Sequence, residues 1–116
     1  MNYPESEDLF AKYLLKAAEL GNSEAMYCLA VCYERGLRGF QVNHTKAFAW
    51  YLESASKNYH PASLEVARIF TVGAIDGSVQ ANPKAAQEFL SRIPKEQLAE
   101  CRQIQQRIAD WLNSQQ

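Results

Sequence analysis

Few residues in this chain have the types and spacing that enzymes use. Ser54 precedes Lys57 by three positions, the Ser-x-x-Lys spacing of one class of serine acyl-transfer enzymes. The companion motifs of that class, Ser-Asp-Asn and Lys-Thr-Gly, do not occur in the sequence. Because the pair falls at the end of an expected helix, we interpret it as structural and expect no catalytic residues, with a serine hydrolase that uses Ser54 and Lys57 as an alternative.

The histidines and cysteines are not arranged as metal ligands. His44 and His60 lie at expected helix boundaries, and no cluster of Asp, Glu or Cys at ligand spacing accompanies them. The loops GLRGF and DGSV lack the glycine spacing and the Gly-Lys-Ser/Thr ending of phosphate-binding loops. We therefore expect no metal and no cofactor. The three cysteines, Cys28, Cys32 and Cys101, are an odd number, which suits packed thiols in a reducing compartment.

The composition is that of an ordinary globular domain. Apolar residues make up 47 % of the 116 residues, charged residues 22 %, and the formal net charge is −1. The charged residues form no cationic stripe, which argues against nucleic acid and anionic membrane as partners. No apolar run approaches the roughly 18 residues that span a bilayer. The first residues, MNYPESED, do not resemble a signal peptide. We expect a cytoplasmic protein, or a periplasmic one if Met1 is not the native start.

Glycine, asparagine and proline divide the chain into six expected helices. Gly21 and Gly36 can end helices in the left-handed conformation, and Ser23 can cap the helix between them. Asn43 can cap a third helix, and Pro61 suits the first turn of a fourth. The expected helices cover residues 6–20, 23–35, 43–58 and 61–73, then run from the Asn-Pro step at 82–83 and from residue 94.

A repeat with an offset of 37 residues underlies these helices. At this offset, small residues align with small residues and aromatic residues with aromatic ones. The aligned pairs are Tyr13 and Trp50, Leu15 and Leu52, Ala18 and Ala55, Ala25 and Ala62, Ala30 and Ala67, Tyr33 and Phe70, and Gly36 and Gly73. Small side chains at helical spacing let helices approach closely, so the repeat indicates packed helix pairs.

The segments EAMYCLAVCYERG and KAFAWYLESASKNYHPAS, with the glycine-containing loop between them, resemble the Sel-1-like repeat, a relative of the tetratricopeptide repeat. The resemblance covers residues 9–93. It implies an all-α fold, a short right-handed α/α solenoid with a C-terminal capping helix. The expected single domain, 1–116, then contains the second helix of a partial repeat at about 6–22, a complete repeat at about 23–60, a diverged repeat at about 61–93 and the capping helix at about 94–113.

The last expected helix has one apolar face and one face of Gln, Arg and Glu. Its apolar residues recur at spacings of three and four: Leu98, Cys101, Ile104, Ile108 and Trp111. We expect this helix, with Trp111, to close the C-terminal end of the stack. The expected core residues are Leu29, Ala30, Tyr33, Tyr51, Ala55, Ala67, Phe70 and Phe89.

The resemblance also implies a class of function. Sel-1-like proteins generally act as scaffolds and adaptors, so we expect a non-enzymatic module that binds a protein or peptide. The chain would be a monomer or would self-associate weakly through its stack ends. A bacterial immunity or antagonist protein that blocks a toxin is an alternative, and so is a structural fragment that mainly self-associates.

By analogy with tetratricopeptide repeats, the first helix of each pair would line a concave face that binds the partner. Tyr27, Val31 and Leu64 would form an exposed apolar strip flanked by Arg35 and Arg68, which favours a segment with acidic residues at its edges. The expected partner-binding residues are Tyr27, Val31, Glu34, Arg35, Leu64, Arg68 and Thr71. If the terminal helices cover this strip, the convex side or the loops at 36–42 and 74–80 would bind instead.

Overall fold

A computed structural model describes residues 9–114, and all regular structure in this part is helical. The helices are α1 (Leu9–Glu19), α2 (Ser23–Arg35), α3 (His44–Ser56), α4 (His60–Val72), α5 (Pro83–Ser91) and α6 (Leu98–Ser114), with a 3₁₀ turn at Lys95–Gln97 before α6. The expectation of an all-α chain is confirmed. The first residues of the helix expected from residue 6 lie outside the described part.

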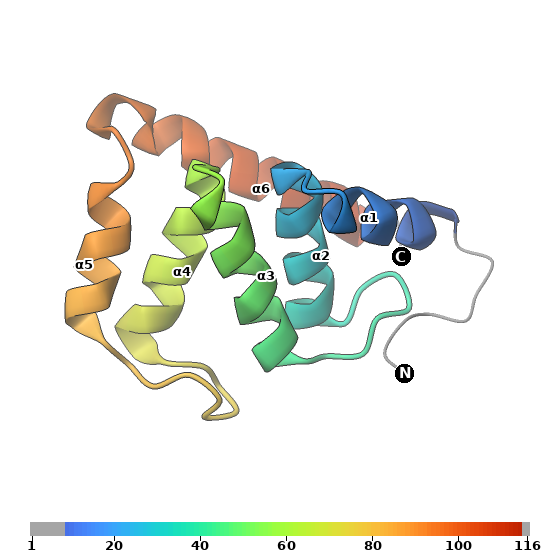
Figure 1. Ribbon diagram of the computed structural model, residues 1–116, viewed down its shortest axis with the longest axis horizontal. Helices are drawn as coiled ribbons and strands as arrows, with labels where there is room; N and C mark the ends of the chain where they lie inside the picture. Colours follow the sequence, from blue (N-terminus) through green and yellow to red (C-terminus); the bar gives the residue numbers. More distant parts are fainter. Residues whose placement is uncertain (1–8, 115–116) are drawn as a thin grey trace.

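Helices that follow one another in the sequence also pack against one another. α1 contacts α2, α2 contacts α3, α3 contacts α4 and α4 contacts α5, which gives the elongated stack in Figure 1. The molecule measures 41 × 30 × 25 Å along its principal axes. This architecture confirms the expected short α/α solenoid.

An asparagine side chain caps the start of three of these helices. Asn22, Asn43 and Asn82 each accept a hydrogen bond from the backbone N–H three residues later, at 2.8, 3.0 and 3.1 Å. The predicted caps at Asn43 and Asn82 are therefore confirmed. The predicted cap at Ser23 is wrong, because Ser23 is already the first residue of α2 and Asn22 precedes it.

Gly36 ends α2 in the left-handed conformation, with φ 68° and ψ 48°. A Cβ atom added there would lie 3.0 Å from Val42 Cγ2. Glycine is therefore favoured both because it adopts a positive φ easily and because a larger residue would crowd Val42. The turn sends the chain into the loop before α3. Leu37 and Phe40 of this loop are buried, and the Phe40 ring lies 4.9 Å from that of Tyr33.

Alanines lie where the helices approach one another. Six alanines at aligned or neighbouring repeat positions are buried: Ala25, Ala30, Ala47, Ala55, Ala62 and Ala67. Larger side chains of the same core fill the space beside them, among them Leu29, Tyr33 and Tyr51. The predictions for these core residues are confirmed. Phe70 and Phe89 are only partly buried, because α5 packs on α4 alone along one side of the stack.

Ala30→Leu tests this packing. Ala30 is fully buried, so a larger side chain would push α2 away from its neighbours and is expected to lower the free energy of unfolding by about 1–3 kcal/mol. Chemical denaturation measures the change. Ala49→Leu on the exposed side of α3 is the matched control, with an expected change within about 0.5 kcal/mol. Equal stability of the two variants would contradict the helix register described here.

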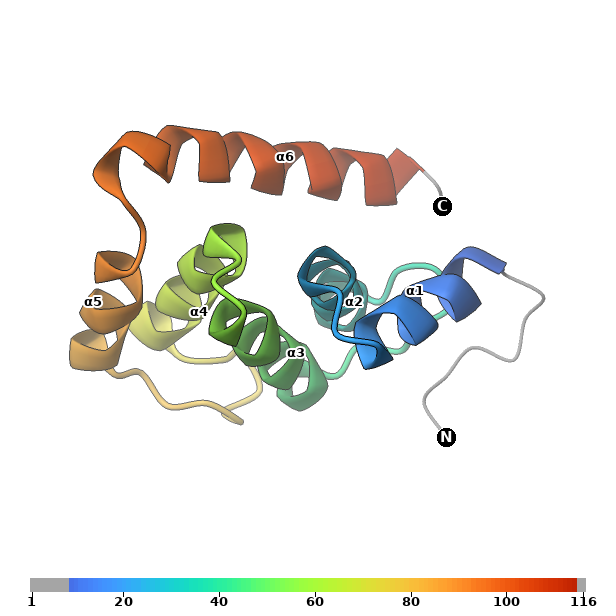
Figure 2. The same cartoon turned by 45° about the horizontal axis from the view of Figure 1, so that its top comes forward.

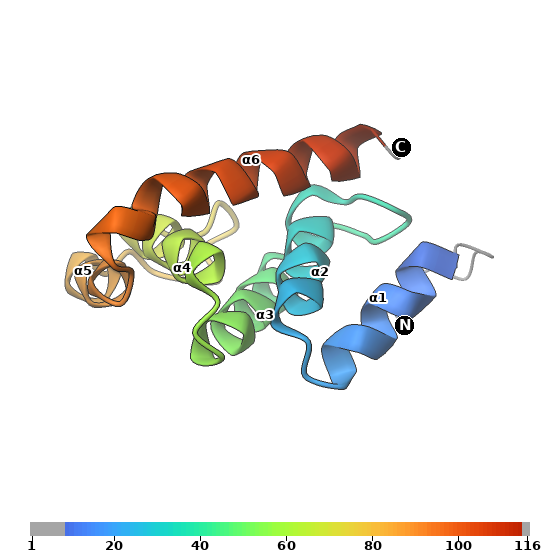
Figure 3. The ribbon, with the colours of Figure 1, turned by 90° about the horizontal axis from the view of Figure 1, so that it is seen from above.

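α6 does not continue the stack but runs back along it. It packs against α4 and α2, and Figures 2 and 3 show it passing from the α5 end toward α1 on the side of α4 and α2. Near its C-terminal end, the Trp111 ring lies 5.1 Å from the Phe10 ring of α1. The prediction that Trp111 closes the C-terminal end of the stack is therefore wrong.

The surfaces available to α6 explain this difference. α5 buries only Ala86, its Phe89 ring packs toward Phe70 of α4, and its other exposed residues are mostly polar apart from Leu90. α1 and α2 offer the apolar side chains of Phe10, Leu14, Ala25 and Cys28. Leu112 is fully buried in the common core, and Ile108 packs against that core. Burial of apolar surface therefore favours packing of α6 along the side of the stack over packing of α6 at its end.

Candidate protein-binding surface

The seven residues expected to bind a partner all lie on α2 and α4, on the side of the stack that faces α6. Tyr27, Val31, Arg35 and Arg68 line one cavity together with α6. Leu64, Arg68 and Thr71 line an adjoining cavity, also with α6. Glu34 joins this group through a contact with Arg68. The structure thus brings all seven residues into one region of the molecule, partly in the core and partly on the surface.

The exposed apolar strip expected at this face does not exist. Tyr27 is 1 % exposed and Val31 is 2 % exposed, and Leu64 is partly buried. The Tyr27 ring packs against the rings of Tyr51 and Tyr59 at 5.6 and 5.7 Å. Tyr27 and Val31 are therefore core residues, because neighbouring helices on both sides and α6 above them exclude water. Arg35, Arg68 and Thr71 are exposed, as expected.

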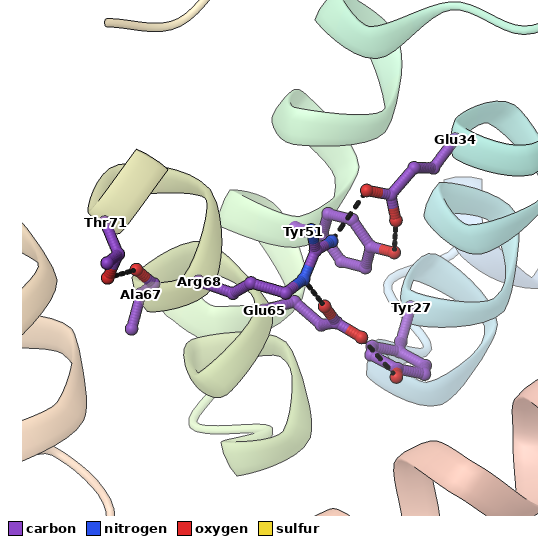
Figure 4. Close-up of polar contacts among 7 residues, drawn as sticks. All are labelled: Tyr27, Glu34, Tyr51, Glu65, Ala67, Arg68 and Thr71. Carbon is purple, nitrogen blue, oxygen red and sulfur yellow. Dashed lines mark hydrogen bonds and ion pairs between the residues drawn. The ribbon is translucent and has the colours of Figure 1, made fainter. Parts of the chain in front are cut away.

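A chain of polar contacts crosses from α2 to α4 through Arg68, as Figure 4 shows. Arg68 donates from Nε to Glu65 Oε1 at 2.7 Å and from Nη2 to Glu34 Oε2 at 2.6 Å. Two tyrosines complete the chain: Tyr27 donates to Glu65 Oε2 at 3.0 Å, and Tyr51 donates to Glu34 Oε1 at 2.8 Å. We call these five residues the Arg68 network. It joins three helices, because Tyr51 comes from α3.

Burial and charge act together in the Arg68 network. Burial raises the pKa of Tyr27, and the nearby negative charge of Glu65 raises it further. Burial likewise raises the pKa of Tyr51, with further contributions from Glu65 and Glu34. Both hydroxyls therefore stay protonated and remain donors. Burial alone would lower the pKa of Arg68, but Glu65 and Glu34 more than offset this and raise it.

Glu34 and Arg68 thus already have partners within the chain, which the sequence analysis did not foresee. Arg68 is half exposed, while the Glu65 side chain is 11 % exposed and depends on Arg68 for its charge balance. Reversing the charge of Arg68 is therefore expected to destabilise the fold. Arg35 is exposed and makes no ion pair with any described residue, so the same change at Arg35 is expected to leave the fold intact.

Two adjoining cavities lie between α6 and the repeat helices, and together we call them the α6 groove. The first, of about 310 Å³, has walls from α2, α4 and α6. The second, of about 350 Å³, has walls from α4, α5 and α6. Both are lined by Arg68 and by Arg102 and Gln105 of α6. The sequence analysis missed the two α6 residues, although they belong to the polar face of the last helix that it identified.

A third cavity, of about 480 Å³, lies between the apolar side of α6 and the helices α1 and α2. Its walls are mainly apolar and include Phe10, Leu14, Ile104 and Ile108. Cys28 also lines it, and burial, with a smaller effect of Glu24, raises the pKa of the Cys28 thiol to about 12. The thiol is therefore protonated at neutral pH and is a poor nucleophile.

The residues considered for catalysis have structural roles or lie at helix ends. Ser54 is fully buried and donates its hydroxyl hydrogen to the backbone oxygen of Ser23 at 2.7 Å, which ties α3 to the start of α2. Lys57 ends α3 and is exposed. A nucleophile must reach its substrate, so this geometry does not support the hydrolase alternative. His44 and His60 begin α3 and α4, as expected.

Metal binding and membrane spanning are two further features to consider for the described residues. Between residues 9 and 114, no three His, Cys, Asp or Glu side chains gather closely enough to hold a metal ion. None of the helices in the same range combines the length and the apolar character needed to cross a membrane.

Comparison with known proteins identifies the repeat. The Sel1 repeat model matches residues 11–22 and 23–59. A plant relative, the "ERAD-associated E3 ubiquitin-protein ligase component HRD3A" of Arabidopsis thaliana, is 39 % identical over 71 residues, which are 60 % of this chain and 10 % of the relative. "DAP3-binding cell death enhancer 1" of Rattus norvegicus and of Mus musculus is 37 % identical over 68 residues, 59 % of this chain and 13 % of each relative.

The chain thus spans about a tenth of the length of these relatives. They come from a plant and two rodents, so they lend no support to the bacterial origin expected for an antagonist protein. The matched residues cover α2, α3 and most of α1. The match to the Sel1 repeat model and the helix-pair architecture agree over residues 11–59.

Proposed function

We propose that this chain is a non-enzymatic protein-binding module that holds a segment of a partner protein in the α6 groove. The groove carries the proposal, because it is the place where exposed residues of α2 and α4 meet a second, independent element, α6. Of the residues expected to bind, Arg35, Leu64, Arg68 and Thr71 remain accessible there.

The family supports the class of function. Sel1 repeats generally mediate contacts between proteins. The plant relative is by its name a component of a ubiquitin ligase, and the rodent relatives are by their name proteins that bind DAP3. Both names describe proteins that act together with other proteins. The partner of this chain is a separate question, because the shared region is a small part of each relative.

The buried groups support binding over catalysis. The tyrosines and carboxylates near the groove are engaged in the Arg68 network and join helices. A rigid wall built in this way favours binding, because little ordering is required when a partner arrives.

Site-specific photo-crosslinking in the native cell tests the location. A photoreactive amino acid replaces Thr71 in the groove, Glu53 on the exposed side of α3, or Ile75 in the exposed loop after α4. We expect a protein adduct from position 71 and none from the other two. Adducts from position 53 or 75 without one from position 71 would move the partner to the convex side or to the loop, and would overturn the proposed site.

A further inference from the structure

The α6 groove gathers positive charge from three helices. Arg35 of α2, Arg68 of α4 and Arg102 of α6 line the same cavity of about 310 Å³. The carboxylate among its lining residues is that of Glu65, which already accepts hydrogen bonds from Tyr27 and Arg68. Glu34 also pairs with Arg68, so the three arginines and these two glutamates carry a net formal charge of +1, and the charges of Arg35 and Arg102 are the ones available to an anion.

The three arginines differ in how firmly they are held. Two carboxylates fix the direction of the Arg68 guanidinium. Arg35 and Arg102 are exposed and form no ion pair with another described residue, so their guanidinium groups remain able to take an anion. Gln105 of α6 adds an amide donor to the same wall, while the Gln106 amide beside it already donates to Asp110 at 2.8 Å. Arginine suits this task because its planar group can donate two parallel hydrogen bonds to a carboxylate.

The adjoining part of the groove is apolar. Leu64 and Ala67 of α4 and Leu90 of α5 line the cavity of about 350 Å³ that shares Arg68 and Arg102 with the first. Leu90 is 41 % exposed, so its side chain can contact an apolar group of a ligand. A ligand that satisfies the whole groove therefore carries an anion next to an apolar side chain.

From these observations we infer that the α6 groove binds a short acidic peptide segment. A Glu or Asp side chain of the segment lies among Arg35, Arg68 and Arg102, and a neighbouring apolar side chain lies against Leu64 and Leu90. Nucleic acid fits less well, because the formal net charge of the chain is −1 and the aromatic ring in the groove wall, that of Tyr27, is buried. The inference rests on the proposed function and specifies the partner that the same groove would take.

Fluorescence anisotropy with labelled peptides tests the inference on the intact chain. The probes are a nonapeptide of mixed Glu and Leu, its counterpart with Gln in place of Glu, and a nonapeptide of Glu alone. We expect the Glu/Leu peptide to bind at least about tenfold more tightly than either of the others, and to weaken as NaCl is raised. Failure of the Glu/Leu peptide to bind at roughly millimolar concentration overturns the inference.

Two further outcomes would also overturn it. Equal binding of the Gln/Leu peptide would show that the arginines do not select the ligand. Tighter binding of a single-stranded oligonucleotide of equal charge would assign the groove to nucleic acid. A different result is a protein crosslink from position 71 while no acidic peptide binds. That result would reject an acidic peptide as the ligand but would leave the proposed protein-binding function in place.

A matched pair of variants locates the peptide. Arg102→Gln removes one arginine of the groove, and Arg107→Gln removes an exposed arginine of the same helix that lines the cavity toward α1 instead. We expect Arg102→Gln to weaken binding of the Glu/Leu peptide about tenfold and Arg107→Gln to leave it unchanged. Arg35→Gln, on a different helix, provides a second test of the groove. Equal affinities of all three variants and the parent chain would contradict the assignment.

Discussion

Leu112→Ala is expected to lower the free energy of unfolding by about 2–5 kcal/mol, because it leaves a cavity where a fully buried leucine joins α6 to the common core. The effect is expected to be large although Leu112 lies only two residues from the end of α6. Thermal or urea denaturation, followed by circular dichroism, measures it.

Leu90→Ala is the matched control for this variant. Leu90 is also a helical leucine, but it is 41 % exposed, so its loss is expected to cost about 1 kcal/mol or less. Comparable stability of the two variants would show that α6 is not seated on the core through Leu112. The two variants also compare the stability contributed by a leucine on the side of the stack, Leu112, with that of a leucine at its α5 end, Leu90.

Arg68→Glu is expected to lower the free energy of unfolding by about 2 kcal/mol. The change removes the cation between Glu34 and Glu65 and adds a third carboxylate beside them. Loss of one partner of a buried ion pair costs about 3–5 kcal/mol and an exposed pair contributes at most about 1 kcal/mol, so the expected effect lies between these values because the Arg68 side chain is 50 % exposed to screening water. Urea denaturation at neutral pH measures the change.

Arg35→Glu provides the control with the same charge change on the same face. Arg35 is exposed and has no ion pair with a described residue, so an effect within about 0.5 kcal/mol is expected. If both reversals were equally harmless, the Arg68 network would contribute nothing to stability, and Arg68 would be an ordinary surface charge. Tyr51→Phe, which removes one hydroxyl donor to Glu34, should then also be neutral.

The individual helices and the solenoid could be predicted from local sequence. Asn43, Asn82 and Pro61 mark helix starts, and Gly36 marks an end, because caps and left-handed turns depend on a few neighbouring atoms. The alanine repeat indicated close helix packing for a similar reason, since each copy makes the same contacts with the next. The predicted cap at Ser23 is wrong by one residue, because both Asn22 and Ser23 are residue types that cap helices.

The surface residues were harder to predict. Tyr27 and Val31 lie beside the core positions of α2, and a helical pattern alone cannot distinguish a position that faces solvent from one that another helix covers. The Arg68 network joins residues of α2, α3 and α4, and Tyr27 and Glu65, which share a hydrogen bond, are 38 positions apart. No local pattern specifies such contacts, because they depend on the relative rotation of three helices.

By itself, the sequence determined six helices, the order in which the first five stack and the family of the repeat. The tertiary structure alone decided where α6 lies, and therefore which face of the solenoid stays open. The apolar stripe of α6 could in principle cover the end of the stack or its side. The larger apolar surface offered by α1 and α2, at the opposite end of the chain from α6, favours the side.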